Sequence, residues 1–129
     1  MEKKTKILAI GDVHGDRRLM EKLAERAEKE NVDLIILAGD LTFADKEARG
    51  IITPFLKAGK QVLLIPGNHE PESTAEFLSQ IYPNVKNIHG YHFYKYGLGV
   101  FGAGGADFGM FSAKDSDIFH TLKQAHEAV

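Results

Sequence analysis

The chain has 129 residues, of which 43% are apolar and 26% are charged, and its formal net charge is −2. This length predicts a single domain over residues 1–129, with the side-chain balance of a globular protein. The small net charge gives no support to a broad nucleic-acid or membrane-binding face, and the absence of cysteine excludes disulfides and thiolate metal sites.

Three short apolar runs predict buried strands at residues 6–10, 32–40 and 61–67. The first run is far too short for a signal-peptide core or a membrane span, so a cytoplasmic protein is expected. Helical patterns separate the runs, and strands that alternate with helices imply right-handed crossovers and a parallel sheet. The sequence therefore predicts an α/β fold.

Two helices are predicted between these strands. The first begins at Asp16, closes at Asn31 and carries a fourfold-spaced apolar stripe formed by Leu19, Leu23 and Ala27. The second begins at Asp45, and Pro54 is expected to kink or break it. Its inward side chains would be Ala48, Ile51, Ile52 and Phe55.

The second half of the chain predicts a helix, a hairpin and a last helix. Residues 73–76 (Ser-Thr-Ala-Glu) fit a capping box, which would open a helix with Phe77, Leu78 and Ile81 on one side. Aromatic residues on both sides of Gly97 predict antiparallel strands. A last helix from about Ser116 would present one apolar stripe formed by Ile118, Phe119, Leu122, Ala125, His126 and Val129.

No helix stop signal follows that stripe, so the domain is expected to be truncated at its C-terminal end. A truncated sheet would expose an edge or a face, and a homodimer would cover it.

Polar residues follow each of the three apolar runs at the same place. Asp12 and His14 come after the first run, Asp40 after the second, and Asn68 and His69 after the third. Ligands of open α/β sheets bind at the carboxyl ends of parallel strands, so these side chains would converge if the strands are neighbours. Each segment alone is also typical of a helix cap or a turn, and the prediction depends on all three together.

This set of side chains suits divalent ions of the Mn, Fe, Zn or Ni kind, because carboxylate, imidazole and amide oxygen are their ligands. A central aspartate such as Asp40 could bridge two ions. Two ions about 4 Å apart bind phosphoryl oxygens and lower the pKa of a shared water toward about 7. The pattern therefore favours phosphoester chemistry.

From about residue 5 to 105 the sequence resembles the calcineurin-like metallophosphoesterases. The family's Asp-x-His block matches Asp12 and His14, its Gly-Asp block matches 39–40, and its Gly-Asn-His-(Asp/Glu) block matches 67–70. The resemblance implies a sandwich of two sheets flanked by helices (α/β/β/α), here incomplete. It implies a phosphomonoesterase or phosphodiesterase with two divalent metal ions, a metal-activated water, a phosphoester substrate and no organic cofactor.

The resemblance also implies residue roles. Asp12 and His14 would bind the first metal, Asp40 would bridge the two metals, and Asn68 would bind the second. His69 would not be a ligand, but would face the phosphate and protonate the leaving oxygen or stabilise the transition state.

Two family features are missing from the sequence. Many members carry an acid three residues after the bridging aspartate to orient the catalytic histidine. Phe43 stands there, and Asp45 and Glu70 are the candidates to replace it. A later lone histidine and a Gly-His-x-His block, both metal-binding in the family, have no counterpart. A non-catalytic scaffold or binding module is therefore the alternative.

Other chemical candidates are less favoured. Arg17 could meet a substrate phosphate, although a solvated first helical turn explains it more simply. A magnesium pocket in which an aspartate accepts a phosphoryl group would suit Asp12 and Asp40, but not the two histidines. The Gly-x-Gly-x-x-Gly pattern at 97–102 lies among strand residues, whereas a dinucleotide site needs it to open a helix. His89, His92, His120 and His126 match no metal-binding block, and His126 is assigned to packing.

Overall fold

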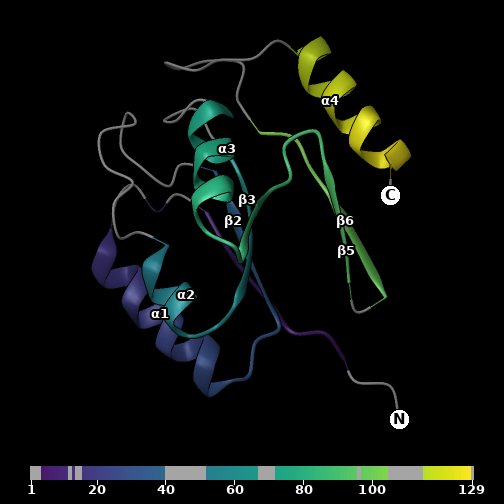
Figure 1. Cartoon of the computed structure of the whole chain (residues 1–129). Coiled ribbons are helices and arrows are strands. Elements are labelled where there is room, and N and C mark those ends of the chain that lie inside the picture. Colours follow the sequence, from purple (N-terminus) through teal and green to yellow (C-terminus); the bar gives the residue numbers. More distant parts are fainter. Residues whose placement is uncertain are drawn as a thin grey trace.

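The computed structural model describes residues 4–11, 13, 16–39, 52–66, 72–95, 97–104 and 115–128. Four strands form a parallel sheet in the order β1-β2-β3-β4, as Figure 1 shows: β1 (Ile7–Ile10), β2 (Leu34–Ala38), β3 (Gln61–Ile65) and β4 (Val85–Asn87). Central strands of a parallel sheet are covered on both faces, which explains why β2 and β3 are continuous apolar runs. The predicted parallel sheet is confirmed.

Three helices connect these strands: α1 (Arg17–Lys29), α2 (Thr53–Lys57) and α3 (Glu72–Ile81). Because the strands are adjacent in chain order and crossovers are right-handed, the connecting helices all fall on one face of the sheet. Figure 1 shows them together on that face. The main core lies between them and the sheet; its fully buried members include Met20, Ile35, Phe55 and Leu64.

The other face of the sheet is covered by an antiparallel hairpin, β5 (His92–Lys95) and β6 (Leu98–Phe101). A second, smaller core joins the two layers, in which Leu34, Leu63 and Ile88 pack with Phe93 and Val100. Outside the hairpin lies α4 (Asp115–Ala128) (Figure 1), so the layer order is α/β/β/α. The predicted hairpin and layered fold are confirmed.

The first helix begins as predicted but buries a different stripe. Asp16 caps α1, because its carboxylate accepts a hydrogen bond of 3.0 Å from the Leu19 N–H. The buried residues are Met20, Ala24 and Ala27, whereas Leu19 is 37% exposed. A helix turns by about 100° per residue, so the neighbouring positions 20 and 24 define an equally regular face. The prediction for Leu19 was wrong.

The next two helices differ from prediction at Pro54 and at residue 73. Pro54 lies in the first turn of α2 and does not kink it, because the first turn needs no N–H donor from that residue. The predicted start at Asp45 lies outside the described residues. In α3 the helix already begins at Glu72, so residue 73 is inside it and the capping box is wrong. The Glu76 carboxylate instead accepts a hydrogen bond of 2.7 Å from Asn87 Nδ2.

Several predicted inward side chains point to solvent. On α3, Ala75 and Leu78 are buried, whereas Phe77 is 57% exposed. On α4, Ala125 is buried, but Phe119 and Leu122 are exposed. Among the described residues, no helix combines the length and apolarity needed to cross a membrane.

Two phenylalanines allow a matched test of the core. Phe55 is fully buried between the helices and the sheet, whereas Phe119 is 63% exposed. Phe55→Ala is expected to lower the free energy of unfolding by about 3–5 kcal/mol, because it removes buried area and leaves a cavity. Phe119→Ala is expected to change it by about 0.5 kcal/mol or less. Urea denaturation measures both, and equal losses would contradict the fold.

Candidate functional site

The carboxyl ends of β1, β2 and β3 meet at one edge of the sheet. Ile10 pairs with Leu37, and Ala38 pairs with Ile65, all in parallel register. The chain therefore leaves three adjacent strands in the same direction, and each time it enters a segment with predicted ligands. The condition on which the site prediction depended, that these strands are neighbours, is met.

The predicted site residues mostly lie outside the described part of the chain. These are Asp12, His14, Asp40, Asp45, Asn68, His69 and Glu70. Their roles stay predictions. Where the structure describes the chain, no group of three or more His, Asp or Glu side chains could hold a metal ion.

The first predicted segment is anchored in the core between its two predicted ligands. Val13 is 2% exposed and belongs to the main core. Its carbonyl oxygen accepts a hydrogen bond of 3.1 Å from the Asp16 N–H, and Asp16 in turn caps α1. The turn after β1 is thus fixed at Val13 by burial and at Asp16 by the helix cap.

The second segment leaves the sheet through a glycine in the left-handed region. Gly39 is buried, has a φ of 78° and directly precedes Asp40 in the sequence. Residues with a side chain rarely adopt this φ, because their Cβ comes too close to the following carbonyl oxygen. The glycine in the Gly-Asp pair is therefore required by the turn itself.

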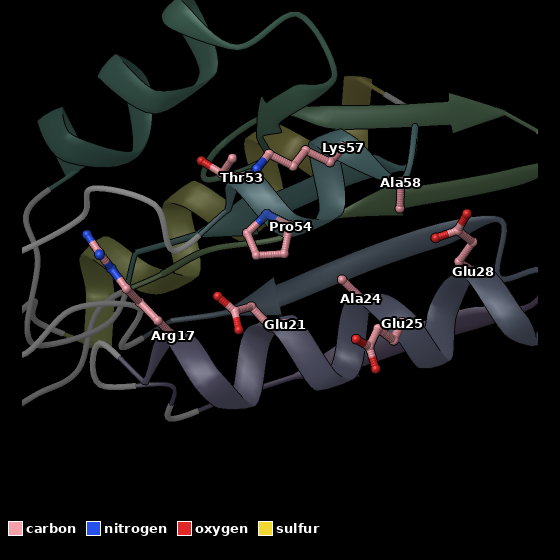
Figure 2. A pocket seen from close by; sticks show the side chains of 9 residues that line it. All are labelled: Arg17, Glu21, Ala24, Glu25, Glu28, Thr53, Pro54, Lys57 and Ala58. Atoms are coloured by element: carbon pink, nitrogen blue, oxygen red, sulfur yellow. The ribbon is translucent and has the colours of Figure 1, made fainter.

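Arg17 is the one candidate site residue for which the structure describes the surroundings. It is exposed, forms the first residue of α1 and lines one end of a groove of about 510 Å³ between α1 and α2 (Figure 2). Three glutamates of α1 line the same groove, at positions 21, 25 and 28, and Lys57 lines it from α2. The predicted metal ligands lie outside the described residues, and the groove itself lies on the helical face of the sheet.

Three of the four histidines outside the predicted blocks have local side-chain contacts in the described part of the chain. His126 packs its ring on Phe101 with a centroid distance of 5.1 Å, and the ring of His120 lies 5.8 Å from that of Phe119. His92 lies in β5. His89 accepts a hydrogen bond of 2.7 Å at Nδ1 from the Gly104 N–H.

A family model described as calcineurin-like phosphoesterase matches residues 5–125. The crystal structure of TT1561 of Thermus thermophilus is similar to this chain, with a TM-score of 0.75, 21% identity and 96% of this chain covered. A second solved structure has a TM-score of 0.71 and 16% identity, with 94% of this chain covered. In both comparisons this chain spans 63% of the solved chain. A search of curated proteins found no match to the sequence.

The chain therefore belongs to the calcineurin-like phosphoesterase family, whose members generally bind divalent metals. The resemblance carried by the three polar blocks is confirmed. The family match extends beyond residue 105 and includes most of α4. The two solved structures support the fold alone, because their sequence identities are low.

Substitutions at two glycines with a left-handed backbone distinguish an effect of backbone strain from an effect on metal binding. Gly39→Ala and Gly59→Ala (φ of 72°) should each destabilise the fold by about 1–2 kcal/mol through backbone strain. A Cβ at Gly59 meets nothing within 4 Å, and this residue lies before β3, at the opposite edge of the sheet. Gly39→Ala should also weaken Mn²⁺ affinity, by roughly the 10- to 100-fold typical of residues that orient ligands. Isothermal titration calorimetry measures the Mn²⁺ affinity of both variants. An equal affinity in the two would contradict a metal site after β2.

Proposed function

We propose that this protein is a metal-dependent phosphoester hydrolase that acts on a phosphomonoester or a phosphodiester. The observation that supports this most directly is the adjacency of β1, β2 and β3. Three sequence blocks of a phosphoesterase family follow the carboxyl ends of these three strands, where open α/β sheets bind ligands.

The predicted donors fit the metals that the family implies. Asp12, His14, Asp40 and Asn68 supply carboxylate, imidazole and amide oxygen, and this set suits two ions of Mn, Fe, Zn or Ni. Such ions, when bound, would neutralise phosphoryl oxygens and make a water molecule acidic enough to act as nucleophile.

The remaining predicted residues act on the substrate itself. His69 would donate a proton to the leaving oxygen, and Asp45 or Glu70 would orient its imidazole. Arg17 is exposed at the start of the helix that follows the first block, where its guanidinium would meet a substrate phosphate.

Hydrolysis of p-nitrophenyl phosphate and bis(p-nitrophenyl) phosphate tests the proposal. Activity should require Mn²⁺, Ni²⁺ or Zn²⁺ and disappear with a chelator. His69→Ala should lower kcat by about 10²- to 10⁴-fold at unchanged metal content, because it removes a general acid. His120→Ala, a change at an exposed histidine of α4, is the matched control and should keep full activity. The absence of hydrolysis by a folded protein loaded with each of these metals would refute the proposal.

A binding or scaffold module is the second candidate, and a specific observation favours it. Many family members carry an acid three residues after the bridging aspartate to orient the catalytic histidine, and Phe43 stands at that position in this sequence. The same experiment separates the two functions. A module would bind Mn²⁺ without turnover, and His69→Ala would leave its metal affinity and its lack of activity unchanged.

A further inference from the structure

A chain of polar contacts links the two sheets next to the third predicted block. Asn87, the last residue of β4, is 5% exposed and donates a hydrogen bond of 2.7 Å to Glu76 of α3. Its side-chain oxygen accepts one of 3.0 Å from the His89 N–H. His89 is half-buried and accepts at Nδ1 a hydrogen bond of 2.7 Å from the Gly104 N–H. The backbone at Gly104 is thus held by the ring of His89, and the backbone of His89 is in turn held by the side chain of Asn87.

Gly104 in turn touches the end of β3. Both Gly104 and Pro66 are buried, and a Cβ added to Gly104 would overlap the carbonyl oxygen of Pro66. Pro66 directly precedes Gly67-Asn68-His69 in the sequence. A further contact holds the 102–104 segment in place, since Gly102 forms a parallel bridge with His89 in which its carbonyl oxygen accepts a hydrogen bond of 2.9 Å from the Gly90 N–H.

We propose that His89 is a positioning residue for the third block: through Gly104 it fixes the backbone at Pro66, the residue that directly precedes this block in the sequence. This inference rests on the function proposed above. A buried N–H needs an acceptor, and the Gly104 N–H finds one in the ring of His89. Nδ1 can accept only when it carries no proton, so this hydrogen bond requires the tautomer of the His89 ring whose proton is on Nε2. His89 thus links the segment after the hairpin, at Gly104, to the first sheet, at Asn87.

Variants at residue 89 test whether the acceptor itself matters. His89→Ala removes it, whereas His89→Asn places an amide oxygen close to the position of Nδ1. His89→Gln moves the oxygen one carbon further and is the second disrupting variant if the alanine variant does not fold. Mn²⁺ affinity, measured by electron paramagnetic resonance, should fall by roughly 10- to 100-fold in the alanine or glutamine variant. It should return close to the wild-type value in His89→Asn, and His120→Ala should not change it.

Nuclear magnetic resonance supplies a readout that needs neither metal nor substrate. In the wild type, the ¹⁵N signals of the His89 ring should show the Nε2–H form. The amide signals of Gly104 and of residues 67–69 should move in His89→Ala or His89→Gln and return in His89→Asn. A proton on Nδ1, or amide signals of residues 67–69 that do not respond, would overturn the inference.

The outcomes also separate this inference from the proposed function. A wild type that hydrolyses the substrates, with His89→Ala equal to His120→Ala in Mn²⁺ affinity, would overturn the positioning role alone. A wild type that neither binds Mn²⁺ nor hydrolyses would refute the proposed function, while amide signals that respond as expected would still support the positioning of the third block.

Discussion

The parallel pairing of β1, β2 and β3 in chain order is the constraint on which the rest of the structure depends. Right-handed crossovers between adjacent strands put the three connecting helices on one face, and this leaves the opposite face for the hairpin. The same pairing brings the three carboxyl ends to one edge. A sheet with another strand order would separate the three polar blocks, whatever their residues. The three blocks can therefore form one site only if the strands pair in this order.

The second layer depends on close backbone approach more than on apolar area. Among the described residues, its core has three buried members, against fifteen in the main core. At Gly102 an added Cβ would lie 3.4 Å from the side chains of Ile65 and Ile88, and at Gly104 it would overlap Pro66. Glycine at these two positions lets the segment after the hairpin lie against the end of β3. The two sheets are thus joined at the edge where the predicted site lies.

The sequence predicted the strands and the hairpin well, because apolar runs and glycine turns are local signals. It did not predict β4, which has only three residues with an exposed Lys86 in the middle. It also assigned Leu19 and Phe77 to the core, although both are exposed. On a short amphipathic helix two neighbouring stripes fit the same spacing, and the choice between them is made by the sheet below. Such tertiary choices have no local signal.

At the site, too, the features with a local sequence signal were predicted and those that depend on tertiary packing were not. The three blocks were found because each follows an apolar run, and strand adjacency then supplied their common edge. His89 belongs to no motif, and its partner Gly104 is fifteen residues away in the sequence. The sequence shows only a histidine after a short strand and a glycine-rich stretch, and neither suggests the other. Yet this pair lies beside Pro66, one residue before the third block. Substitutions in the hairpin layer that shift Gly104 should therefore also displace Pro66, because these two buried residues are packed in direct contact.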